Sequence, residues 1–174
     1  MQKVSKTPIN LKKIDKILKR ASKTEKLVDG MLAQVECPWE GEKGKCKTTG
    51  RCAIGELLFR AGFKDSELAT GQLLEGSSNS KAAKALKKEY GIPHSIVYSI
   101  EGVNDNTDTE NRYENVMAFI TFAEVMRQQG IAVKGSSYLE GFYGSEYDVD
   151  TGMMVPVDVP LEAGAPESEN FDED

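Results

Sequence analysis

The sequence predicts a small, mainly α-helical, single-domain protein with a C-terminal hairpin and a disordered acidic tail. Several segments repeat apolar residues at the spacing of an amphipathic helix, and residues that cap helices stand at their ends. The composition changes at Gly135, after which the chain has no Lys or Arg. We therefore expect a flexible arm over 1–9, the helical domain over 10–134, a Gly- and Tyr-rich extension over 135–157, and the disordered tail over 158–174.

The first part of the domain predicts two apolar stripes. Asn10 is a good N-cap, and apolar residues follow it at helical spacing. They are Leu11, Ile14, Leu18 and Ala21. Residues 22–25 have the pattern of a capping box, and the sequence leaves open whether the helix breaks there or continues. The second stripe comprises Leu27, Val28, Met31, Leu32 and Val35.

The middle of the chain alternates between loop and helix signals. Periodicity is lost over 36–51, which contains several glycines and is expected to be a loop. Helices are expected over 52–61 and 81–90, and Gly91 ends the second of them. The apolar residues at 96–100 fit either a short buried helix or a strand.

The last part of the domain predicts its longest helix. Thr107 and Glu110 have the pattern of another capping box, and the helix that follows ends near Gly130. Beyond this point, glycines and prolines interrupt every periodic pattern. The aromatic residues within 136–157 are too apolar for a simple linker, so this stretch favours a hairpin.

Charge is distributed unevenly along the chain. Residues 1–134 contain 22 basic and 17 acidic residues, whereas residues 135–174 contain 11 acidic residues and no Lys or Arg. Five basic residues crowd the first predicted helix: Lys12, Lys13, Lys16, Lys19 and Arg20. They could bind nucleic-acid phosphates or an acidic protein surface, and the solvated face of an amphipathic helix would have the same composition.

Composition also bears on location. No stretch approaches the roughly 20 apolar residues that a membrane span needs, and the N-terminus shows no apolar signal core. The cysteines are three, an odd number, which argues against a closed set of disulfides and favours reduced thiols or metal ligands. We therefore expect a cytoplasmic protein that does not bind membranes.

Short motifs occur in a recognisable order along the chain. Trp39 is followed by Gly50-Arg51-Cys52-Ala53-Ile54-Gly55-Glu56-Leu57 and later by Asn104-Asp105, after which a helix is predicted. This order resembles a family of bacterial and phage proteins of unknown function, whose members share a Cys-Ala-Leu/Ile-Gly helix start and a later Asn-Asp turn. The resemblance extends over residues 11–130. It implies a small helical domain from a bacterium or its virus. It implies no activity, because none is assigned to the family.

Cys52 has the sequence context of a reactive thiol. A cysteine at a helix N-terminus, here beside Arg51, is favoured as the thiolate. His94, the single histidine, and Asn104 follow it in the order that papain-like hydrolases use. The glutamine that such enzymes place before the cysteine is absent, and Cys46 stands at that spacing. A small buried Cys52 and a surface or capping His94 would explain the same residues.

The cysteines also have the spacing of metal ligands. Cys37, Cys46 and Cys52 match the first three ligands of a zinc finger with three cysteines and one histidine. The position of the fourth ligand holds Glu56, which would make an uncommon structural site. The alternative interpretation is three unrelated free thiols.

These patterns lead to three functional hypotheses. The first is a non-enzymatic bacterial or phage accessory protein without a cofactor, which acts by binding a protein partner. Its candidate interaction residues are Trp39, Asn104, Asp105, Lys12, Lys13, Lys16, Lys19 and Arg20. The second is a zinc-stabilised nucleic-acid-binding protein that uses the cysteine loop and the basic first helix. The third is a cysteine hydrolase with Cys52 as its nucleophile.

Overall fold

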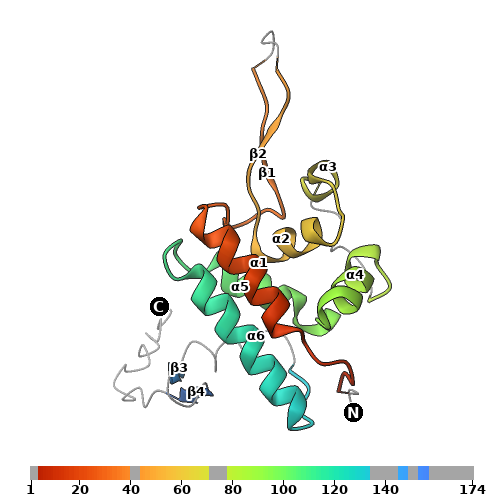
Figure 1. Cartoon of the computed structure of the whole chain (residues 1–174), viewed down its shortest axis with the longest axis vertical. Coiled ribbons are helices and arrows are strands. Elements are labelled where there is room, and N and C mark those ends of the chain that lie inside the picture. The colour runs from red at the N-terminus through yellow and green to blue at the C-terminus, as the bar shows by residue number, and fades with distance from the viewer. Residues whose placement is uncertain (1–3, 40–43, 71–77, 134–144, 149–152, 157–174) are drawn as a thin grey trace, which may run out of the picture.

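The computed structural model is a mainly helical, single-domain protein, as predicted (Figure 1). It describes residues 4–39, 44–70, 78–133, 145–148 and 153–156. Within these ranges the helices are α1 (Leu11–Lys23), α2 (Ala53–Arg60), α3 (Asp65–Leu68), α4 (Lys81–Tyr90), the 3-10 helix η2 (His94–Ile96), α5 (Val97–Asp105) and α6 (Arg112–Gln128). The strands are β1 (Gln34–Glu36), β2 (Lys47–Gly50), β3 (Ser145–Asp148) and β4 (Met153–Pro156).

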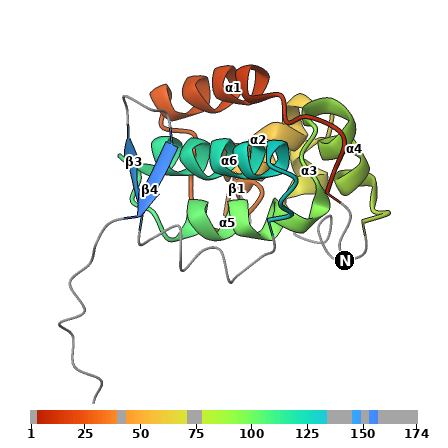
Figure 2. The same cartoon turned by 90° about the horizontal axis from the view of Figure 1, so that it is seen from below.

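One hydrophobic core joins the helices. Figure 2 shows α6 between α1 and α5, and α2 packs against both α1 and α5. Each of the longer helices contributes a fully buried apolar side chain. Examples are Leu18 from α1, Leu57 from α2, Leu86 from α4, Ile100 from α5 and Phe119 from α6. Because these side chains belong to one cluster, the helices form a single folded unit.

The predicted helices α1 and α4 have the expected caps. Asn10 precedes α1, and its side chain accepts a hydrogen bond from the backbone N–H of Lys13 at 3.1 Å. α4 spans residues 81–90 and ends at Gly91, whose φ of 72° is the left-handed conformation that often closes a helix. The open choice at 96–100 is resolved as helix, since η2 and α5 run through it.

The second apolar stripe, over 27–35, is not a helix. α1 ends before Thr24, and Glu25 has a φ of 53°, which is incompatible with a continuing right-handed helix. The chain then runs irregularly to β1, with Leu27 and Leu32 buried. Leu27 and Leu32 therefore serve the core without helical geometry, whereas Met31 is exposed.

The longest helix, α6, begins later than predicted. It starts at Arg112, and Thr107 does not cap it. The Thr107 hydroxyl instead donates to the carbonyl of Val103 at 2.6 Å, at the end of α5. Asn104 and Asp105 lie in the last turn of α5 rather than in the Asn-Asp turn that the family resemblance implies.

The segment predicted as a loop over 36–51 contains part of a β-hairpin. β1 and β2 pair antiparallel, with Glu36 opposite Lys47. In Figure 1 this hairpin projects far from the helical body. We call it the finger, and its described residues are 34–39 and 44–50.

A second antiparallel hairpin follows the helical domain, as predicted for the stretch 136–157. β3 and β4 pair with Ser145 opposite Pro156 and Asp148 opposite Met153. The predicted disordered tail, 158–174, lies outside the described residues. Among the helices that the structure describes, none is long and apolar enough to cross a membrane.

Candidate functional site

The finger is closed by a disulfide bond. Because Glu36 lies opposite Lys47 in the antiparallel register, the next residues outward are Cys37 and Cys46. These two cysteines are bonded to each other. The bond lies just beyond the last paired residues, so it prevents the two strands from separating at their outer end.

Trp39 lies beyond the disulfide bond and is 84% exposed. Among the described residues, the other exposed large apolar side chains are less accessible. They are Met31, Tyr98 and Ile131. An aromatic side chain of this kind buries roughly 150–250 Å² when it is covered. The finger therefore carries a large apolar group into water, away from the core.

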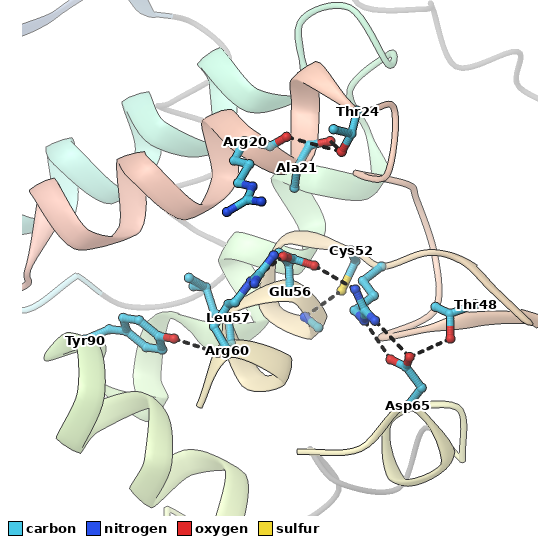
Figure 3. Close-up of polar contacts among 12 residues, drawn as sticks. Arg20, Ala21, Thr24, Thr48, Cys52, Glu56, Leu57, Arg60, Asp65 and Tyr90 are labelled. Carbon is cyan, nitrogen blue, oxygen red and sulfur yellow. Dashed lines mark hydrogen bonds and ion pairs between the residues drawn. The ribbon is translucent and has the colours of Figure 1, made fainter. Parts of the chain in front are cut away.

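Arg51 follows β2 and joins the base of the finger to the helical body. Its guanidinium contacts both carboxylate oxygens of Asp65, with Nε 2.7 Å from Oδ1 and Nη2 2.8 Å from Oδ2. Its Nη1 donates to Glu56 Oε2 at 3.0 Å, and the guanidinium carbon lies 3.6 Å from the centre of the Phe59 ring. Thr48 of β2 also donates to Asp65, at 2.6 Å (Figure 3). These contacts link β2 to α2 and α3.

The network at the base of the finger is charged, and its central pair, Arg51 and Glu56, is buried. Arg51 is 8% exposed and Glu56 only 2%. Glu56 accepts a second hydrogen bond, from Arg60 Nε at 3.0 Å. The hydrogen bond from Arg51 holds the pKa of Asp65 below its usual value. Since a buried charge is costly unless it is paired, Arg51 and Glu56 depend on each other and on their partners in this network.

Asn104 and Asp105 hold the irregular segment that leads from α1 into the finger. The Asn104 Oδ1 accepts from the backbone N–H of Ala53 at 3.0 Å, and its Nδ2 donates to the Val28 carbonyl at 2.9 Å. Asp105 Oδ1 accepts from the backbone N–H of Gly30 at 2.8 Å. Both candidate interaction residues thus bond within the protein, and Asn104 is fully buried.

Two glycines of the Gly-Arg-Cys-Ala-Ile-Gly motif allow chain segments to approach closely. A Cβ on Gly55 would lie 1.8 Å from the carbonyl oxygen of Leu32, and one on Gly50 would lie 2.5 Å from Cγ1 of Val28. Only a residue without a side chain fits such spacing. The two glycines therefore let the segment before β1 pack against α2 and the end of β2.

The three candidate catalytic residues do not come together. Cys52 caps α2, where its Sγ accepts a hydrogen bond from the backbone N–H of Gly55 at 3.3 Å. Burial outweighs that hydrogen bond and raises the pKa of the Cys52 thiol to about 12, the opposite of an activated thiolate. Asn104 lies nearby, since it bonds to Ala53. His94 begins η2, roughly 15 Å from Asn104 along η2 and α5 at the usual helical rise.

The predictions for the cysteines need correction. Cys37 and Cys46 are bonded to each other, so the expectation of reduced thiols or free metal ligands is wrong for this pair. An odd count leaves one cysteine free, here Cys52, without preventing a bond between the others. The carboxylate of Glu56, the candidate fourth ligand, forms ion pairs with Arg51 and Arg60. The described residues contain no group of three or more His, Cys, Asp or Glu side chains placed to hold a metal ion.

The disulfide also bears on the compartment that was inferred from the cysteine count. Disulfide bonds persist mainly in oxidising compartments, whereas cytosolic thiols are kept reduced. The cysteine count therefore no longer supports a reducing environment. The cytoplasmic location remains a prediction.

The five basic residues predicted on the first helix are all exposed on α1. They are Lys12, Lys13, Lys16, Lys19 and Arg20. Lys13 is engaged locally, because its Nζ lies 3.0 Å from Glu89 Oε2 and 4.8 Å from the centre of the Tyr90 ring. The other four form no ion pair within the part of the chain that the structure describes. They leave a positively charged surface along one side of α1.

The structural contacts of two arginines that build the site have no signal in the sequence. Sequence patterns single out Arg51 only for its charge beside Cys52, and no spacing pairs it with Asp65. Arg112 donates to the carbonyls of Leu27, at 3.0 Å, and Asn104, at 2.9 Å. Both arginines act on partners that are distant along the chain or irregular in structure, so local patterns cannot reveal them.

No protein-family model matches the chain, and no curated protein or solved structure shows detectable similarity to it. The motif residues around Cys52 and Asn104 bond within the protein, whereas Trp39 stands in water at the outer part of an anchored hairpin.

Proposed function

We propose that this protein is a non-enzymatic accessory protein that binds a partner protein through the finger. Trp39 is the residue that inserts into the partner. The observation that carries this proposal is the 84% exposure of the indole on a hairpin that is anchored at its base and covalently closed further out. Tryptophan is among the residue types that most often dominate the binding energy of protein interfaces.

The anchoring of the finger supports a binding role. A flexible loop loses conformational freedom when it binds, and this loss weakens the complex. Here the disulfide holds the strands together, and Arg51 fixes the end of β2 to Asp65 and Glu56. The finger is therefore organised before it meets a partner, which favours tight binding by a small surface.

The charge of the finger favours a protein over a nucleic acid as its partner. Residues 34–50 contain three acidic and three basic residues, so the hairpin has no excess of positive charge. Nucleic-acid binding depends on cations that neutralise phosphates. A neutral hairpin with one large aromatic residue fits an apolar pocket on a protein better.

The resemblance of the 50–57 motif and of Asn104-Asp105 to bacterial and phage proteins supports an accessory role in such a system. The residues of these motifs hold the finger rather than a reaction centre. In this proposal the helical domain is the platform and the finger is the contact element. A location in the cytoplasm of a bacterium or an infected cell remains part of the proposal.

A second candidate function, nucleic-acid binding, rests on α1. Lys12, Lys16, Lys19 and Arg20 are exposed and form no ion pair with a described residue. Such a row can follow a phosphate backbone without reading its sequence. Binding to arbitrary duplex DNA that weakens steeply with salt, and that is lost in a Lys16→Gln/Lys19→Gln variant, would favour this candidate.

The principal experiment is an affinity pull-down that compares three full-length proteins. Each is immobilised and exposed to a lysate of the cells in which the protein naturally occurs. They are the wild type, Trp39→Ala, and the control Tyr98→Ala, which removes an aromatic side chain 54% exposed on the helical body. We expect the wild type and the control to retain the same partner and Trp39→Ala to lose it. With the purified partner, Trp39→Ala should raise Kd by roughly tenfold or more. Equal retention by all three proteins would refute the proposed role of the finger.

A further inference from the structure

A pocket on the far side of the domain from the finger is built by four segments. They are the described residues 4–9 of the N-terminal arm, residues 78–79 with one face of α4, residues 93–96 at η2, and the residues around the end of α6. Figure 2 shows the arm running beside α4. The backbone N–H of Asn10 donates to the carbonyl of Tyr90 in α4 at 2.8 Å, and the backbone N–H of Ile9 donates to Glu124 Oε2 in α6 at 3.0 Å, so the arm is held against both helices. The pocket has a volume of about 890 Å³, which is enough for a small organic ligand.

The charged side chains that line the pocket are basic. Lys6, Lys84 and Lys87 line it without forming an ion pair to any described residue. Arg127 also lines it, but this guanidinium is neutralised by Glu124, with Nε 2.7 Å from Oε2. Within the described lining there is no Asp or Glu. Among the described residues, no acidic side chain of the lining therefore compensates the charge of these three lysines.

The rest of the lining is partly apolar. Ile9, Ala83, Ile96, Ala123 and Val133 all line the pocket and are buried. The lysines lie at the exposed side, since Lys6, Lys84 and Lys87 are all exposed. The pocket thus combines an apolar floor with a cationic rim, and His94 and Ser95 add hydrogen-bonding groups beside it.

We propose that this pocket binds a small phosphate ester, with its phosphate at Lys84 and Lys87 and its apolar part on the floor. Three uncompensated cations match a ligand with two or more negative charges better than a monocarboxylate, which one cation would satisfy. Lys84 and Lys87 lie three residues apart on α4, so they share one side of the helix and can contact the same phosphate. A free inorganic anion would leave the apolar floor unused.

The test is calorimetric titration of the full-length protein with adenosine diphosphate, inorganic pyrophosphate and adenosine. We expect saturable binding of adenosine diphosphate, weaker binding of pyrophosphate, and none of adenosine. A Lys84→Gln/Lys87→Gln variant should bind adenosine diphosphate roughly tenfold more weakly. The matched control is Lys16→Gln/Lys19→Gln, which removes the same charge from exposed residues of α1 and should bind as the wild type does. Because all four lysines are exposed, neither variant should unfold.

Three results would overturn the inference. They are a failure of both adenosine diphosphate and pyrophosphate to bind saturably, an equal loss of affinity in the two lysine variants, and equal affinity for adenosine diphosphate and pyrophosphate. The second would show a general effect of net charge, and the third would show that the apolar floor contributes nothing. Trp39→Ala should bind adenosine diphosphate as the wild type does, so this test is independent of the finger.

Discussion

The guanidinium of Arg51 donates two hydrogen bonds of nearly equal length, 2.7 and 2.8 Å, to the two carboxylate oxygens of Asp65. Asp65 begins α3, and Arg51 directly follows β2. This pair therefore ties the base of the finger to a helix that lies 14 residues further along the chain. The third nitrogen of the same guanidinium reaches Glu56 in α2, so one side chain fixes the direction in which the finger leaves the domain.

Arg51→Ala should destabilise the protein by about 3 kcal/mol, because it leaves the carboxylate of Glu56 buried with only Arg60 as a partner. The matched control is Arg60→Ala, which removes the more exposed partner of the same carboxylate and should cost below about 1 kcal/mol. Denaturant unfolding of both variants measures the difference. Equal losses would mean that the Arg51 contacts contribute little to stability.

Removal of the disulfide should loosen the finger and leave the helical domain intact. In a Cys37→Ser/Cys46→Ser variant, the ten-residue loop that the bond closes regains conformational freedom worth about 2–3 kcal/mol. Amide hydrogen exchange should therefore become faster across β1 and β2 and stay unchanged in α6. Unchanged exchange in both strands would show that the hairpin does not need the bond.

Stability should depend on pH through Glu101. Burial, with a contribution from the nearby Asp105, raises the pKa of this carboxyl from 4.5 to about 7. A raised pKa means that the folded state holds the proton more tightly than the unfolded chain does. The contribution of Glu101 to stability is thus complete below pH 4.5 and is lost as the pH rises through 7.

The variant Glu101→Gln mimics the protonated carboxyl and should remove this dependence. At pH 8 it should be more stable than the wild type by about 1 kcal/mol, after allowance for the partial exposure of the side chain. At pH 5 the difference should shrink markedly. Thermal unfolding of both proteins at the two pH values measures it, and a difference that is the same at pH 5 and pH 8 would contradict the assignment.

Cys52 should be an inert thiol. Burial raises its pKa to about 12, and its side chain is 1% exposed, so little thiolate forms and reagents have poor access. A thiol reagent at pH 7 should label the folded protein slowly and the unfolded protein quickly. Fast labelling of the folded protein would contradict this prediction and support Cys52 as a nucleophile.

Local signals account for the elements that the sequence predicts well. α1 and α4 both have apolar residues at helical spacing and a capping residue whose effect is local. Asn10 caps the start of α1, and Gly91 caps the end of α4. Trp39 is one of the candidate interaction residues, and its side chain is exposed in the structure. Such predictions hold because they depend on neighbours in the chain.

Long-range contacts account for the parts that the sequence misses. The apolar spacing over 27–35 fits a helix, but Val28 and Gly30 bond instead to Asn104 and Asp105. These partners lie more than 70 residues away, and they override the local helical preference. The cysteine pairing likewise depends on a strand register that forms only when the hairpin folds.

Site-directed photocrosslinking tests the proposed role of the finger most directly. A photoreactive phenylalanine analogue is placed at position 39 in one protein and at position 98, on the helical body, in another. Each protein is irradiated with the partner that the wild type retains. The proposal predicts a covalent product from position 39 and none from position 98. A product from position 98 alone, or none from position 39, would contradict the assignment of the finger as the binding element.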